Sequence, residues 1–132
     1  KDKLLVKIIK SFKKNKVEII NGKWNQEFLG MKVSIKIVDS LNDAINFINT
    51  YSKKHSEGII AQDKNAIDIF CQSIDSATIF VNSSTRLHDG YVFGLGSEMG
   101  IATGKLHARG PVGLKELSIY KWIVYGKGHI RE

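Results

Sequence analysis

The sequence predicts an α/β fold built around a parallel sheet. Between residues 31 and 81, segments with strand-like and helix-like apolar spacing alternate as strand, helix, strand, helix and strand. Such alternation over about fifty residues is typical of parallel strands joined by helical crossovers. The last segment, residues 77–81 (ATIFV), is a continuous apolar run, which indicates a strand covered on both faces. A chain of 132 residues is large enough for one such domain with a single core.

The first elements are a helix and two strands. The spacing of apolar residues between lysines predicts an amphipathic helix with its apolar side inward, formed by Leu4, Leu5, Ile8, Ile9 and Phe12. A short strand is expected over residues 17–20, followed by a turn at Asn21-Gly22. Residues 23–30 (KWNQEFLG) are irregular, and residues 31–38 alternate as a strand does.

Two further helices are marked by capping residues. Asp39-Ser40 precedes a helix whose inward stripe is formed by Leu41, Ala44, Ile45, Ile48 and Tyr51. Residues 58–61 form the next short strand. Asp63 caps the following helix, and its inward residues are Ala66, Ile67, Phe70, Cys71 and Ile74.

Charge and composition exclude some classes of function. The net charge is +7, but residues 1–16 hold seven lysines and one aspartate, so they account for +6 of it. The basic excess is therefore a solvated helix face, which argues against a nucleic-acid surface. The single cysteine, Cys71, cannot form an internal disulfide. We expect it to be a small buried apolar side chain on a helix. No apolar run is long enough for a membrane span, and residues 1–10 (KDKLLVKIIK) make a poor signal peptide because charges recur through them, so a cytoplasmic location is expected.

Residues 81–114 stand apart from the rest of the chain. They hold seven of the twelve glycines and the only proline, a composition that excludes a regular core element. They also carry too many apolar side chains to stay disordered. Because the segment leaves the C-terminal end of the predicted buried strand, where open α/β sheets bind ligands, we expect an ordered wall of a binding site.

Known motifs do not explain this wall. Gly94-Leu95-Gly96 lacks the third glycine of a dinucleotide fingerprint, since Met99 stands there, and residues 100–105 are one residue too short for a phosphate loop. His88 and His107 have no zinc-ligand spacing, so no metal site is predicted. No nucleophile with a positioned base is visible.

The last apolar segment, residues 117–125 (LSIYKWIVY), is predicted to be a strand. An exposed strand of this kind must be paired or covered. Two alternatives remain, pairing with another subunit or with an edge in the same chain. We treat residues 117–132 as an oligomerisation strand and tail, separate from residues 1–116.

Three strings point to a known family. They are NSSTR at residues 82–86, FGLGSEMGI at residues 93–101 and KLHARGPVGL at residues 105–114. Together with KKHSEGII and IDSATIFVN, they closely resemble the C-terminal region of the gamma-glutamyl phosphate reductase family, which belongs to the aldehyde dehydrogenase superfamily. The resemblance covers residues 24–132 well and the first helix loosely. It implies that residues 1–116 form the C-terminal part of an aldehyde-dehydrogenase-like catalytic domain, with residues 81–114 as an active-site wall.

The resemblance also implies an activity. Family members reduce L-glutamyl 5-phosphate to L-glutamate 5-semialdehyde with NADPH and release phosphate, in proline biosynthesis, through a thioester on a cysteine. This chain lacks the amino-terminal cofactor domain and the catalytic cysteine, because Cys71 does not match that motif. The link between Ile20 and Glu27 is also shorter than the family pattern. We therefore expect NADP(H) as cofactor, no catalytic residue in this chain, and activity only together with the rest of the enzyme.

Cofactor-binding residues are implied in one loop. Glu27 in QEFLG matches the glutamate that contacts the nicotinamide ribose in the superfamily, and Leu29 is expected to pack near the nicotinamide. The alternative for Glu27 is a solvated loop carboxylate.

Substrate contacts are implied after the buried strand, at Asn82, Ser83, Ser84, Thr85 and Arg86. Arg86 is suited to a carboxylate or phosphate, but pairing with Asp89 to brace the loop is an equal alternative. His107 and Arg109 either brace the loop, which is favoured, or reach the substrate. We expect Glu98 to accept hydrogen bonds that brace the glycine-rich loop. His55 either lies near the site or has a capping role.

Two other functions remain open from the sequence. One alternative is a non-catalytic assembly or binding module that keeps the aldehyde dehydrogenase scaffold. It also fits the reductase part of a bifunctional pyrroline-5-carboxylate synthase.

Overall fold

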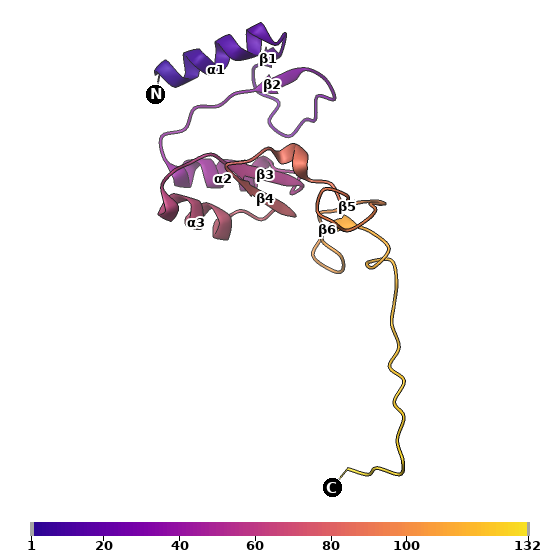
Figure 1. The fold of residues 1–132 in the computed structure, drawn as a ribbon. Helices are drawn as coiled ribbons and strands as arrows, with labels where there is room; N and C mark the ends of the chain where they lie inside the picture. Colours follow the sequence, from indigo (N-terminus) through magenta and orange to yellow (C-terminus); the bar gives the residue numbers. More distant parts are fainter. Residues whose placement is uncertain (1, 132) are drawn as a thin grey trace.

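The centre of the computed structural model, which describes residues 2–131, is a parallel pair of strands. Strands β3 (Ser56–Ile59) and β4 (Thr78–Val81) are joined by helix α3 (Lys64–Ser73), with Gly58 opposite Phe80. Helix α2 (Leu41–Tyr51) packs beside α3, as Figure 1 shows. The predicted strand–helix–strand crossover is therefore confirmed, although the first of its two strands lies at Ser56–Ile59 and not at residues 58–61.

The predicted caps start both helices. Ser40 accepts a hydrogen bond from the backbone N–H of Asp43 at 3.0 Å, and Asp63 accepts one from Asn65 at 2.9 Å. The helices bury Ile45, Phe70 and Ile74 against one face of the sheet, where Ile59 and Ile79 contact them. Complete burial of a side chain of this size contributes roughly 1.5–3 kcal/mol, so this cluster is the main apolar core.

The opposite face of the same strands is also covered. Because side chains alternate along a strand, Gly58 and Phe80 point away from the helices. The short helix η1 (Thr85–Leu87) packs against β3, and the rings of His88 and Phe93 lie 6.1 and 6.4 Å from the ring of Phe80. The prediction that this strand is covered on both faces is confirmed for residues 77–80, whereas Val81 at its end is exposed.

A separate pair of strands carries the N-terminal helix. Helix α1 (Asp2–Lys14) packs on β1 (Glu18–Ile20), which pairs in parallel with β2 (Lys32–Ser34). The prediction of one strand over residues 31–38 is wrong in length, because β1 ends at Ile20 and offers no backbone partner beyond Ser34. The strands also form separate two-stranded sheets and not one continuous sheet.

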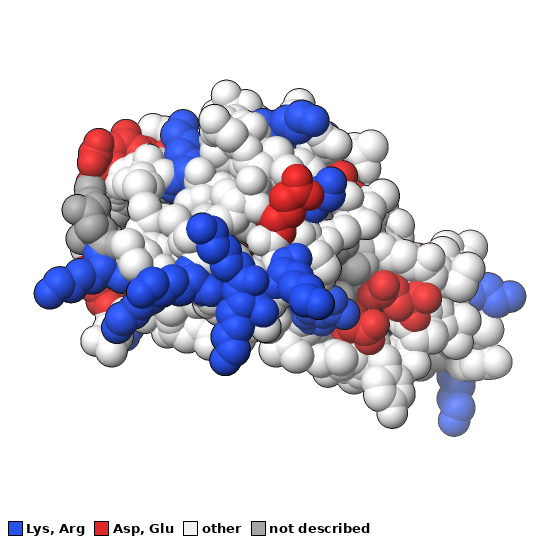
Figure 2. Space-filling view, turned by 90° about the horizontal axis from the view of Figure 1, so that it is seen from above, with Lys and Arg blue, Asp and Glu red and all other residues white. Residues whose placement is uncertain are grey.

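Helix α1 leaves its lysines in solvent, as expected. Figure 2, seen from above, shows lysine and arginine side chains gathered in a band across this face. The apolar side is only partly covered, since Leu4 and Ile8 remain exposed while Leu5, Ile9 and Phe12 are half-buried. Within residues 2–131, no helix is long and apolar enough to cross a membrane.

The glycine-rich residues 81–114 are ordered and contain a small antiparallel hairpin. Its strands, β5 (Gly100–Ala102) and β6 (Gly110–Val112), lie in a stretch where the sequence predicted no strand. Two glycines are required by close backbone contacts, because a Cβ at Gly90 would lie 2.8 Å from the carbonyl oxygen of Ser97 and a Cβ at Gly113 would lie 2.9 Å from it. The wall is thus packed backbone against backbone.

The predicted strand over residues 117–125 is not formed in this chain. After a turn at residues 114–117 the backbone runs away from the domain, as Figure 1 shows. Ile119, Tyr120 and Trp122 are more than four-fifths exposed. Pairing with an edge of the same chain is therefore wrong for the described residues, and a β conformation here requires a partner.

We predict that Gly90→Ala destabilises the glycine-rich wall. The added Cβ meets a backbone carbonyl that cannot rotate away, so the free energy of unfolding should fall by about 1–3 kcal/mol in urea titrations. Gly104→Ala is the matched control, because a Cβ there meets open space and should change stability by less than about 1 kcal/mol. Equal effects of the two substitutions would contradict the close-contact explanation.

Candidate functional site

The candidate substrate segment begins with a residue that is fixed in place. Asn82 has a left-handed backbone with φ of 53°, a conformation that asparagine tolerates better than most residues. Its side-chain oxygen accepts a hydrogen bond from the N–H of Ala61, and its side-chain nitrogen donates to the carbonyl of Ala61, both at 2.9 Å. The amide group of Asn82 is thus engaged with the backbone that follows β3.

The next four predicted residues lie on the surface. Ser83, Ser84, Thr85 and Arg86 are all exposed, and Ser84 accepts a hydrogen bond from the N–H of Arg86 at 3.2 Å, which starts η1. The carboxylate of Asp89 accepts hydrogen bonds from the N–H groups of Tyr91 and Val92. In residues 2–131, no ion pair joins Arg86 to Asp89, so the bracing alternative for Arg86 is wrong.

A buried histidine ends this segment. Nδ1 of His88 lies 2.6 Å from the hydroxyl of Ser56, and Nε2 lies 2.9 Å from the hydroxyl of Thr78. The Ser56 hydroxyl also lies 2.7 Å from Nδ1 of His55, so His55 does lie beside the segment. Burial lowers the pKa of His88 below its ordinary value, the nearby His55 lowers it further, and Glu98 opposes the shift.

Two carboxylates brace the glycine-rich wall. Glu98 accepts a hydrogen bond from the N–H of Gly90 at 2.8 Å, which confirms its bracing role. Asp75, just before β4, contacts Lys54 and Lys105 at 2.9 Å each and Arg109 at 2.8 Å. These hydrogen bonds, that of Lys54 first, hold the pKa of Asp75 well below its usual range.

Arg109 and Lys105 flank the predicted residue His107. The contact between Arg109 and Asp75 links the wall to the loop that precedes β4, as the favoured bracing role of Arg109 requires. His107 is exposed, and among the described residues no bracing contact assigns it a role.

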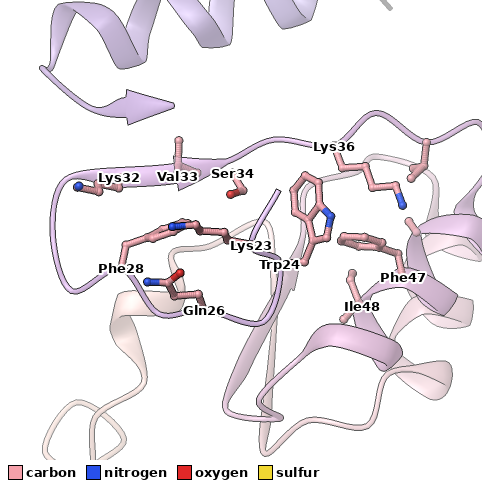
Figure 3. Close-up of a pocket in the computed structure, with 12 residues that line it drawn as sticks. Lys23, Trp24, Gln26, Phe28, Lys32, Val33, Ser34, Lys36, Phe47 and Ile48 are labelled. Carbon is pink, nitrogen blue, oxygen red and sulfur yellow. The ribbon is translucent and has the colours of Figure 1, made fainter. Parts of the chain in front are cut away.

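The loop with the predicted cofactor residues is attached to helix α2. Figure 3 shows Trp24 next to Phe47 of α2, and their ring centres are 5.3 Å apart in an edge-to-face contact. Nζ of Lys36 lies 4.0 Å from the ring centre of Phe47, and a cavity of about 460 Å³ lies between this loop, β2 and α2. The contact of Trp24 thus attaches the loop to α2 three residues before Glu27, and Gln26 and Phe28 on either side of Glu27 line the cavity.

Glu27 and Leu29 themselves are exposed. Glu27 lies at the edge of a second cavity of about 520 Å³, together with His55, Ser56 and Glu57. Leu29 is 93% exposed and has a left-handed backbone. The carboxylate of Glu27 is thus accessible beside an open cavity, where it can accept hydrogen bonds from vicinal hydroxyls such as those of a nicotinamide ribose.

Sequence reasoning missed Ser56 and Thr78 and gave His88 no role. Ser56 lies 32 residues from its partner His88 in the sequence, and Thr78 lies 10 residues from it, so no motif spacing could reveal these contacts. Within the described residues, no group of three or more His, Cys, Asp or Glu side chains is arranged to hold a metal ion. Cys71 is half-buried on α3.

The His88 contacts predict that stability falls as the pH drops. The pKa of His88 is lower in the folded chain than its ordinary value of 6.5, so the unfolded state binds more protons in the interval between the two values. This contribution is fully present above about pH 6.5 and is lost as the pH falls through the folded-state pKa. Urea unfolding at a series of pH values measures it.

His88→Gln should flatten this part of the pH dependence. His129→Gln, at an exposed histidine in the C-terminal tail, should leave it as in the wild type. The assignment to His88 fails if both variants keep the wild-type slope.

Comparisons with known proteins agree on one family. No family model matches the chain. Gamma-glutamyl phosphate reductase of Bifidobacterium adolescentis is 55% identical over 109 residues, which are 83% of this chain and 26% of that protein. The protein of the same name from Halothermothrix orenii is 44% identical and matches 99% of this chain and 35% of its own length. That alignment spans 147 positions, more than the 132 residues of this chain, so the relative has residues in the aligned region that this chain lacks.

The fold agrees with a solved structure. The crystal structure of gamma-glutamyl phosphate reductase from Thermotoga maritima superposes with a TM-score of 0.89 at 38% identity, over 97% of this chain and 35% of that chain. The chain thus spans about a quarter to a third of the length of these relatives. Over this length, sequence and fold place the chain in the gamma-glutamyl phosphate reductase family.

Proposed function

We propose that the chain is the C-terminal part of the catalytic domain of a gamma-glutamyl phosphate reductase and contributes the substrate side of its active site. The complete enzyme would reduce L-glutamyl 5-phosphate to L-glutamate 5-semialdehyde with NADPH and release phosphate, in proline biosynthesis. The observation that carries this proposal is that relatives of this name match 82–99% of the chain. The exposed residues after β4 are a second support, because they offer groups that bind anions.

The substrate carries two anionic groups, an α-carboxylate and an acyl phosphate. The guanidinium of Arg86 can donate two parallel hydrogen bonds to either group, and the hydroxyls of Ser83 and Thr85 lie on the same exposed segment. Binding the substrate in one orientation presents its acyl carbon to a cysteine from the rest of the enzyme. Phosphate is then the leaving group.

Glu27 and Leu29 are the residues proposed to contact the cofactor. Bound NADPH supplies the hydride that reduces the acyl group. Glu27 would accept hydrogen bonds from the ribose hydroxyls, and Leu29 would provide an apolar contact for the nicotinamide. The contact between Trp24 and Phe47 holds this loop on α2 and so limits its movement.

Arg86→Ala in a complete reductase that carries this chain should raise KM for L-glutamyl 5-phosphate about 10- to 100-fold, as expected for loss of charge-assisted hydrogen bonds. Steady-state kinetics with the acyl phosphate varied measures this change. Arg131→Ala, at an exposed position in the C-terminal tail, is the control and should keep the wild-type KM. An unchanged KM in Arg86→Ala would remove Arg86 from the substrate site.

We also propose that residues 117–125 pair with a second copy of the chain. Their apolar side chains are exposed, and an unpaired β-prone segment gains backbone hydrogen bonds on pairing. Deleting residues 117–132 should therefore reduce the number of chains per particle, obtained by light scattering as the measured molar mass divided by the mass of one chain, whereas deleting only residues 126–132 should not. A number of chains per particle unaffected by the longer deletion would exclude this assembly mode.

A further inference from the structure

Residues 82–88, which we call the bridge segment, cross the face of the β3–β4 sheet that the helices leave open. The segment leaves β4 after Val81 and returns at His88 to the start of both strands, where Ser56 and Thr78 lie. It approaches the sheet closely, because a Cβ at Gly58 would lie 3.6 Å from the side-chain methyl of Thr85. The contacts at the two ends of the bridge segment, at Asn82 and at His88, hold it in this path.

The first end is held by Asn82. Its N–H donates to the carbonyl of Ile59 at 2.8 Å, and its amide makes the two bonds to Ala61. The backbone bond continues the pairing of β3 with β4 past Val81, and the two side-chain bonds extend it to Ala61. They also fix the left-handed turn that directs Ser83 away from the strand.

The second end is held by His88. Each ring nitrogen contacts one hydroxyl, that of Ser56 or that of Thr78. A neutral imidazole has one donor and one acceptor, and a hydroxyl can be either, so a neutral ring makes both bonds without leaving a ring nitrogen unpaired. Ser56 and Thr78 come from different strands, so one ring fixes the segment against both.

Between these two attachments, the side chains of Ser83, Thr85 and Arg86 remain exposed. We propose that Asn82, Ser56 and Thr78 are positioning residues, the last two through His88, which hold the bridge segment in the shape that binds the acyl phosphate. This inference rests on the proposed function, and none of the three needs to touch the substrate. Asn82 thereby acts through the backbone and not as a substrate ligand.

The test uses a pair of variants at one position. Thr78→Val keeps the shape of the side chain and removes only the hydroxyl, whereas Thr78→Ser keeps the hydroxyl. In a complete reductase that carries this chain, Thr78→Val should raise KM for L-glutamyl 5-phosphate about three- to tenfold with little change in kcat. Thr78→Ser should restore the wild-type KM. Thr50→Val removes a hydroxyl bonded to Asn46 within α2 and should change neither parameter.

A second measurement does not depend on activity. Hydrogen–deuterium exchange at residues 83–87 should be faster in Thr78→Val and in Asn82→Gly, which keeps the left-handed turn but loses the amide. Exchange in Thr78→Ser should match the wild type. The positioning role is overturned if Thr78→Val leaves both KM and exchange unchanged, or if Thr78→Ser behaves like Thr78→Val. A wild-type enzyme that does not reduce the acyl phosphate would instead overturn the proposed function. In that case the hydrogen–deuterium exchange measurement would still decide whether the hydroxyl of Thr78 holds the bridge segment.

Discussion

The structure depends on burying both faces of a two-stranded parallel sheet. A pair of strands this short is not stable by itself, so β3 and β4 need a layer on each side. Helices α2 and α3 supply one layer through Ile45, Phe70 and Ile74. The other layer is the bridge segment with His88 and Phe93, which carries the candidate substrate residues. The same residues therefore complete the fold and form the candidate site, which links the stability of the sheet to the geometry of the site.

Local signals predicted the helices well. Ser40 and Asp63 act at close range through their own backbone neighbours, and the helical spacing of Ile45 and Phe70 follows from burial on one side. The strands were predicted less well, because their length depends on a partner that is distant in the sequence. Residues 35–38 alternate as a strand does, yet lie outside β2, which ends where β1 ends. Residues 117–125 have strong β propensity but no strand partner among residues 2–131, so they remain without strand structure.

Family resemblance and structure contribute different information about the site. The strings NSSTR and KLHARGPVGL predict which residues belong to the candidate site, and the comparisons support the family to which these strings point. Only the structure separates residues that hold the loop from residues that face solvent. Asn82 and Arg109 belong to the first group, and Arg86 belongs to the second. The motif alone treats these residues alike, because the difference arises from contacts with Ala61 and Asp75.

The contacts of Asp75 differ in kind from those of His88. Lys54, Lys105 and Arg109 meet at a single carboxylate that is partly open to water, so dissolved ions screen this attachment of the β5–β6 hairpin. The hydrogen bonds of His88 are partly buried and join uncharged groups, so added salt affects them little. Ionic strength and acidity thus act on separate parts of one wall. Raising the salt concentration at neutral pH loosens the hairpin end while the bridge segment keeps its shape.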